Sequence, residues 1–116
     1  MDIFVVWWGA PLESRSAFVR LKREDVLTSS QEGELIELLE ELSSTWVEIL
    51  ASENVRKTAA RLLMIHLLRA ADSLQLAAAL IWSGTPVEKN EFVCLDRKLR
   101  EAARNEGFVV LPKKFD

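Results

Sequence analysis

Acidic residues at the ends of apolar segments are the part of this sequence whose types and spacing could do chemistry. Asp72 opens an alanine-rich apolar stretch, and Asp96 follows the apolar run 92–95. Glu13 lies just beyond a third apolar run, residues 3–8. Taken alone, an acid at such a position is most often a helix cap or a partner of the helix dipole. Three of them in one short chain favour a shared site.

Carboxylates that share a site predict a bound cation. The carboxyl ends of parallel strands meet on one side of a sheet, where ligands collect, so Glu13, Asp72 and Asp96 could line one pocket. Carboxylates this close repel one another unless a cation neutralises them. Oxygen ligands suit Mg²⁺ or Mn²⁺ rather than zinc, and the common chemistry of such sites is phosphodiester hydrolysis.

Composition sets the class of protein. With 116 residues, 49% of them hydrophobic and 28% charged, we expect one globular domain, residues 1–116. The longest uncharged apolar stretches, 3–12 and 73–85, are too short to span a bilayer. A single cysteine, Cys94, makes no intramolecular disulfide and is typical of a small buried side chain. We therefore expect a cytoplasmic protein without a membrane anchor.

The net charge of −3 argues against a broad basic surface for nucleic acid, but an acidic metal site reaches phosphates through its cation.

Apolar periodicity predicts the elements that must position these acids. A strand and helix after residue 90, followed by another strand, form a βαβ unit with parallel strands. Ser29 and Glu32 have the spacing of a capping box for a helix carrying the apolar stripe 35–42. Residues 46–50 are either an edge strand or an extended connection. The only histidine, His66, lacks a second ligand at metal spacing and is expected to be structural. We expect strands over 3–8, 91–95 and 108–111, and further helices over 11–24, 53–66, 71–82 and 96–105.

Three blocks of the sequence resemble the PIN domain of VapC-type toxins. They are residues 6–17 with 20–21, residues 68–77, and residues 92–99 with 102–108. They cover nearly the whole chain in the order of the family. The resemblance implies an α/β, PIN-like three-layer fold with a mostly parallel sheet flanked by helices. It also implies a fold that is incomplete at the N-terminus, because the family's first strand, with one or two helices, has no match here.

The resemblance carries a function with it. It implies a Mg²⁺- or Mn²⁺-dependent endoribonuclease, the toxin of a toxin-antitoxin pair, forming a homodimer and inhibited by a small antitoxin protein. Glu13, Asp72 and Asp96 match three acidic residues of the family's catalytic metal site. The fourth, an Asp at the end of the missing strand, has no match, and Asp2 lies at the wrong end of its strand to replace it. The missing strand is the middle of the family's sheet, so its neighbours would keep an unpaired edge open to another chain.

Other interpretations stay open at this point. Four arginines lie within a turn or two of the acids and either contact RNA phosphates or form ordinary surface ion pairs. A catalytically inactive PIN-like protein that acts through protein-protein interaction is the main alternative, and exposed Trp7 and Trp8 would favour it. An unrelated α/β binding module with ordinary helix caps is a third. The four arginines are Arg15, Arg20, Arg97 and Arg100.

Overall fold

The computed structural model describes residues 4–84, 87 and 90–114. The chain divides into two compact units, Met1–Leu50 and Ala51–Asp116. Helices and short parallel strands occur in both units, so the α/β class expected from the sequence is confirmed. The expectation of a single domain over the whole chain stays a prediction.

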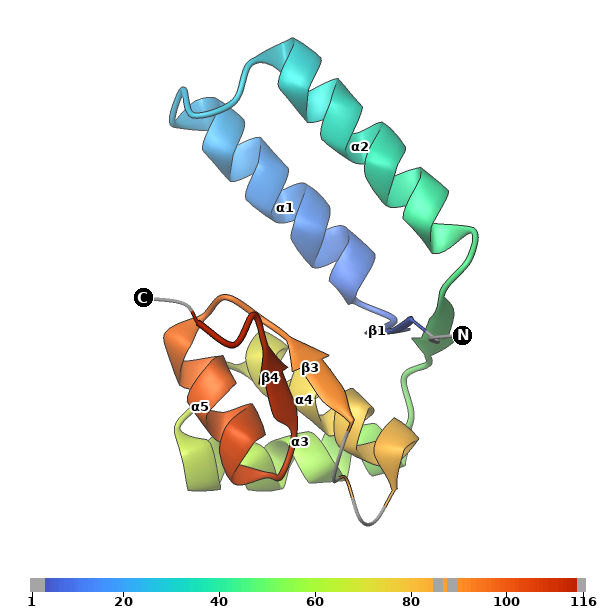
Figure 1. Cartoon of the computed structure of the whole chain (residues 1–116), viewed down its shortest axis with the longest axis vertical. Helices are drawn as coiled ribbons and strands as arrows, with labels where there is room; N and C mark the ends of the chain where they lie inside the picture. The colour runs from blue at the N-terminus through green and yellow to red at the C-terminus, as the bar shows by residue number, and fades with distance from the viewer. Residues whose placement is uncertain (1–3, 85–86, 88–89, 115–116) are drawn as a thin grey trace. The chain divides into compact units, whose positions relative to one another are not determined.

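The first unit is a helical hairpin carried on a strand pair (Figure 1). Strand β1 (Val5–Trp7) leads into α1 (Ala10–Arg23), and α2 (Ser29–Ser43) leads into β2 (Val47–Ile49). The strands β1 and β2 are parallel, with Val5 opposite Val47 and Trp7 opposite Ile49. The segment after α2, for which the sequence left two alternatives, is therefore a strand.

Apolar residues of the first unit are mostly left at the surface. The apolar stripe expected over 35–42 of α2 is only partly covered, since Leu35 and Leu39 are half-buried but Leu38 and Leu42 are exposed. Neither α1 nor α2 has a fully buried residue. Trp7 is buried, whereas Trp8 is 58% exposed. Ion pairs join the two helices: Arg15 to Glu40 and Lys22 to Glu32, each at 3.3 Å. Large exposed apolar side chains of this hairpin are Leu12, Val19, Leu38 and Leu42.

The cap of α2 lies one residue earlier than the sequence suggested. Thr28 is the N-cap: its hydroxyl accepts from the Gln31 amide at 3.1 Å, and the Gln31 side chain accepts from the Thr28 amide at 2.9 Å. Two capping boxes overlap in this segment, and only one can form. The prediction of a box from Ser29 to Glu32 was wrong, since Glu32 pairs with a lysine of α1 instead.

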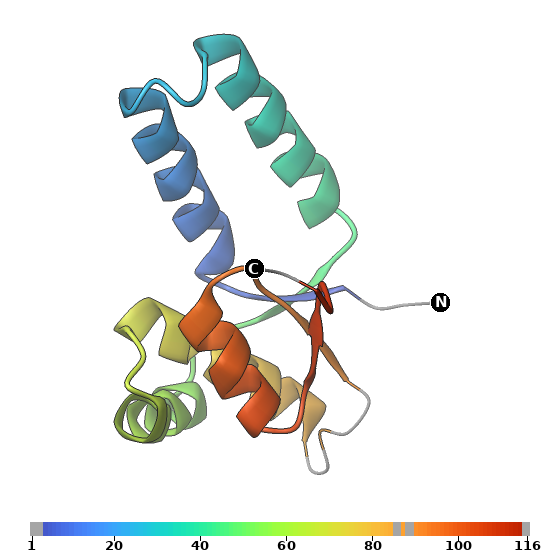
Figure 2. The same cartoon turned by 60° about the vertical axis from the view of Figure 1, so that its left-hand side comes forward.

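The second unit contains α3 (Glu53–His66), α4 (Ala70–Ser83), β3 (Glu91–Val93), α5 (Arg97–Asn105) and β4 (Val109–Leu111). β3 and β4 are parallel, with Phe92 opposite Val110, as the predicted βαβ unit required. Helix α3 packs against α4 at a steep angle, the chain bending by 118° between them, and α5 packs on β4 (Figure 2). This arrangement brings the start of α4 and the start of α5 into the same unit.

Local sequence signals explain where these elements begin and end. Ser52 caps α3, its hydroxyl accepting from the Val55 amide at 3.1 Å. Gly107, with φ +107°, follows α5 in a conformation that glycine adopts without strain. The alanine-rich α4 is the central helix of the unit, because small side chains allow close packing from several sides. The core of this unit contains Val55, Leu62, Leu76, Ala77, Phe92, Leu99, Ala103 and Phe108.

The strands of the described residues form two sheets of two strands each, both parallel. The preference for parallel pairing was predicted, but a continuous sheet is not seen in this part of the chain. No single helix among the described residues is long and apolar enough to cross a membrane. By length and composition, α3 and α4 pass that test only as a pair bent by 118°.

Candidate functional site

Asp96 stands between β3 and α5 and is held by the first turn of that helix. It is the N-cap residue: its Oδ1 accepts from the Leu99 amide at 2.9 Å, and its backbone carbonyl accepts from the Arg100 amide at 2.9 Å. The residue itself is exposed. The ordinary role of a helix cap is thus confirmed for Asp96, and it fixes the direction of the carboxylate while leaving it accessible to solvent.

Asp72 lies in the first turn of α4. The N-cap of this helix is Arg69, without a side-chain capping bond, so the simple reading of Asp72 as a helix cap was wrong. Asp72 is half-buried, and its neighbour Ser73 uses its hydroxyl to donate to the Ala70 carbonyl at 2.7 Å. An acid in this position complements the helix dipole. Its carboxylate is not fixed in the geometry that a capping hydrogen bond would require.

The two aspartates interact electrostatically. Burial raises the pKa of Asp72 above its ordinary value of 3.8, and the negative charge of Asp96 raises it further, while Arg69 opposes the shift. Like charges raise a carboxyl pKa only when they lie close enough for repulsion to matter. The structure therefore brings together two of the three predicted acids, at the starts of two helices next to the β3–β4 pair.

Cys94 lies beside the two carboxylates. Its thiol is within 3.6 Å of the Asp96 carbonyl, and the residue is half-buried rather than buried as expected. Burial raises the pKa of this thiol. A hydrogen bond with the Asp96 backbone lowers the thiol pKa, the charges of Asp96 and Asp72 raise it, and the Arg100 guanidinium lowers it. Both aspartates thus act on a third group, which places their charges in one small region.

Glu13 belongs to the first unit and lies one turn into α1, as the sequence predicted. It is half-buried. Its amide donates to the Gly9 carbonyl at 3.1 Å, in line with the first-turn position of this acid. Acids in a first helical turn complement the dipole. The geometry of the candidate site therefore concerns Asp72 and Asp96.

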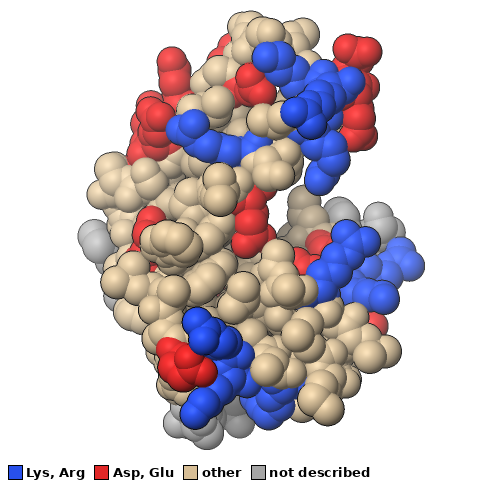
Figure 3. Space-filling view, turned by 180° about the vertical axis from the view of Figure 1, so that it is seen from behind, with Lys and Arg blue, Asp and Glu red and all other residues tan. Residues whose placement is uncertain are grey.

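The four arginines predicted to contact RNA have different surroundings. Arg15 pairs with Glu40, and the exposed Arg20 is 3.9 Å from Glu24. Arg97 is the exposed first residue of α5, directly after Asp96. Lysine and arginine side chains also gather on the face drawn in Figure 3, next to acidic ones.

Arg100 differs from the other three. It is only 5% exposed, and its guanidinium donates to two backbone carbonyls: Nη1 to Cys94 at 2.8 Å and Nη2 to Pro112 at 2.6 Å. A buried guanidinium whose donors bind backbone carbonyls fixes the positions of those backbone segments. The prediction that Arg100 touches phosphate finds no support in this geometry.

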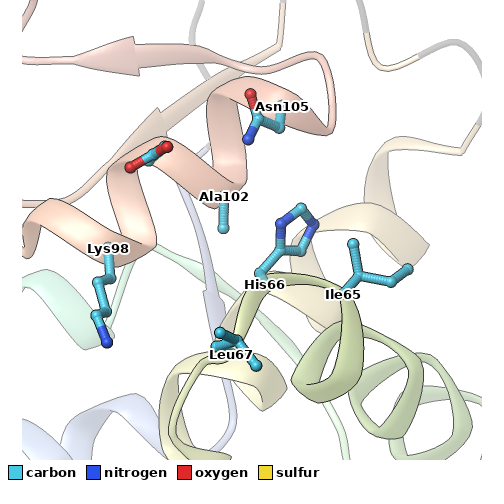
Figure 4. A pocket seen from close by; sticks show the side chains of 7 residues that line it. Ile65, His66, Leu67, Lys98, Ala102 and Asn105 are labelled. Atoms are coloured by element: carbon cyan, nitrogen blue, oxygen red, sulfur yellow. The ribbon is translucent and has the colours of Figure 1, made fainter.

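A separate pocket lies between the end of α3 and one side of α5 (Figure 4). His66 borders it with its ring, and His66 Nε2 is 2.7 Å from Glu106 Oε2. The His66 side chain is 9% exposed, and that of Glu106 is 18% exposed. The structural role expected for His66 is supported by this pairing, which ties α3 to the end of α5. The partner could not be predicted, because forty positions separate the two residues. The pocket is lined by Ile65, His66, Leu67, Lys98, Glu101, Ala102 and Asn105.

The donor set near Asp72 fits a hard divalent cation in its chemistry. It offers two carboxylates, and the charge of Asp96 raises the pKa of Asp72, a repulsion that a cation would relieve. Among residues 4–84, 87 and 90–114, no group of three or more His, Cys, Asp or Glu side chains that could hold a metal ion is assembled. Two aspartates are thus the part of the predicted site that the structure places together.

No protein-family model matches the sequence, and no curated protein matches it.

Proposed function

We propose that the chain is a PIN-like, Mg²⁺- or Mn²⁺-dependent endoribonuclease of the VapC toxin type, with Asp72 and Asp96 as the residues that hold the cation. The observation that carries the proposal is the electrostatic coupling of these two aspartates at the starts of α4 and α5. The sequence resemblance assigns the same two residues to a metal site. By that resemblance Glu13 is the third acid of the site.

The parallel strand pairs support a PIN-like fold as part of this proposal. The resemblance implies a mostly parallel sheet flanked by helices, and the strands of the described residues form two parallel pairs, one in each unit.

The residues around the site suit the proposed chemistry. When bound, the cation would activate the attacking water and stabilise the charge that develops on the phosphate. The Leu99 amide holds one oxygen of Asp96. Arg97, exposed next to Asp96, is the arginine best placed to contact an RNA phosphate. By the same resemblance, the partners would be RNA, a small antitoxin and a second copy of the chain.

RNA cleavage in the presence of Mn²⁺ tests the proposal. The wild-type chain is compared with Asp72→Asn, Asp96→Asn and Glu101→Gln, the last being an exposed acid of α5 and a matched control. Asparagine caps a helix about as well as aspartate, so Asp96→Asn keeps the fold and removes only the charge. We expect cleavage by the wild type and the control, and its loss in both asparagine variants. Equal cleavage by all four proteins would mean a contaminating nuclease and would contradict the proposal.

Exposed apolar side chains on the hairpin support the second candidate, an inactive PIN-like protein that acts by binding another protein. Trp8 and Leu12 are 58% and 74% exposed, a surface that a protein partner could cover. Trp7, by contrast, is buried and does not contribute. If the folded chain neither binds Mn²⁺ nor cleaves RNA, while Trp8→Ser weakens its self-association in sedimentation, this second function replaces the first.

A further inference from the structure

Arg100 joins the ends of two neighbouring strands. Cys94 directly follows β3 and still pairs with β4, its amide donating to the Leu111 carbonyl at 3.1 Å. Pro112 directly follows β4. The guanidinium of Arg100 donates to the carbonyls of both Cys94 and Pro112. One side chain of α5 thus holds both strands at the point where they leave the sheet.

Asp96 is the second residue after Cys94, so the same helix holds this segment at several points. The Arg100 side chain binds the Cys94 carbonyl, and the Arg100 amide binds the Asp96 carbonyl. The Leu99 amide binds the Asp96 carboxylate. A displacement of the Cys94 carbonyl would therefore move Asp96 relative to Asp72 on α4.

Bridging two carbonyls in this way requires the planar guanidinium of arginine, which carries two terminal nitrogens. Its two nitrogens reach two carbonyls of separate chain segments at once. Because the planar group is preorganised, less side-chain entropy is lost per hydrogen bond than for lysine. A lysine would keep the positive charge in this 5% exposed position but present a single nitrogen. Arginine and lysine at position 100 therefore carry the same charge but differ in where they place their hydrogen-bond donors.

We infer that Arg100 is a positioning residue for the candidate metal site, setting the place of the Asp96 carboxylate by bridging the Cys94 and Pro112 carbonyls. The inference rests on the proposed function, because Arg100 affects metal binding only if Asp72 and Asp96 hold a cation. Such a cation requires its two carboxylates at a fixed separation. Residues that orient metal ligands typically change metal affinity by about 10- to 100-fold when they are replaced.

The test compares Arg100→Lys with Arg104→Lys, which makes the same change one turn further along α5 at an exposed position. Arg100→Gln is a second variant of the buried residue. Amide hydrogen exchange of the full chain is measured at Leu99, whose amide binds Asp96, and at Leu76 in the core of α4 as a reference. Mn²⁺ affinity is measured by paramagnetic broadening of amide signals near Asp72.

We expect both Arg100 variants to speed Leu99 exchange by about tenfold or more, with Leu76 unchanged, and to weaken Mn²⁺ binding by about tenfold. If Leu76 exchange rises in step with Leu99, Arg100 is a general stabiliser and the inference is overturned. It is equally overturned if Arg100→Lys binds Mn²⁺ as tightly as Arg104→Lys. If the wild type itself shows no Mn²⁺ broadening, the proposed function fails, whereas a selective Leu99 response would still support the positioning of Asp96.

Discussion

Removing the charge of Asp72 should stabilise the folded chain, an unusual result for a substitution in a partly buried position. The pKa of Asp72 is raised because burial and the charge of Asp96 disfavour its anion. Asp72→Asn keeps the size and polarity of the side chain and removes the repulsion. We therefore expect a higher melting temperature at neutral pH in the absence of divalent cations.

The size of the effect follows from the exposure of the pair. Asp96 is exposed and Asp72 half-buried, so solvent screens most of the repulsion, and a value of about 0.5 kcal/mol is appropriate. An unfolding entropy of about 2.1 cal/mol/K per residue gives about 0.24 kcal/mol/K for this chain. The melting temperature should then rise by about 2 °C.

The pH dependence has a definite sign. Because the folded-state pKa of Asp72 is raised, its favourable contribution is complete below the ordinary pKa of 3.8 and is lost as pH rises through the raised value. The advantage of Asp72→Asn should therefore be largest near neutral pH and vanish below about pH 4. Thermal unfolding followed by circular dichroism at several pH values measures it.

A double-mutant cycle and added Mn²⁺ separate this explanation from others. Once Asp72 is neutral, Asp96→Asn should bring no further gain, because the repulsion is already gone. With Mn²⁺ at ten times its dissociation constant, the wild type should gain about 1.4 kcal/mol, and the asparagine variants should not. Additive effects of the two substitutions, or an equal gain from Glu101→Gln, would refute the reasoning.

Three further predictions concern the fold. Glu106→Ala should cost about 1 to 3 kcal/mol in urea unfolding, because it leaves the largely buried His66 ring without this partner. Thr28→Ala should cost about 1 kcal/mol and Ser29→Ala less than about 0.5 kcal/mol, since only Thr28 caps α2; the reverse order of stabilities would contradict the observed cap. Gly107→Ala should cost more than about 1 kcal/mol in thermal unfolding because of its φ of +107°, and an unchanged melting temperature would show that this turn can relax.

Local signals explain what the sequence could predict. Ser52 and Asp96 each precede a helix that begins at the next residue, and Gly107 follows a helix end, so α3 and α5 were placed within one or two residues. The cap of α2 was misplaced because two equivalent boxes overlap. Glu32, the expected partner of Ser29, pairs instead with Lys22 of α1, a contact that a local pattern does not contain.

Tertiary contacts explain what the sequence could not predict. Arg97 and Arg100 lie one turn apart on the same helix, yet Arg100 is buried beneath two strand ends and Arg97 faces solvent. Only the packing of α5 on the strand pair distinguishes them. The parallel-strand argument applies to Asp96, which follows β3. Asp72 follows helix α3 instead, so the packing of α4 against α5 is what brings the two charges near each other.

The absence of any fully buried residue in α1 and α2 has a consequence for how the chain opens. Separating these helices exposes little that was hidden from water, so the energetic barrier against such a sub-global opening is small. Limited proteolysis should cut first between them, near Asp25, while α4 with its buried Leu76 and Ala77 resists. This cut would leave α2 attached to the protected part of the chain, which is built around α3, α4 and α5.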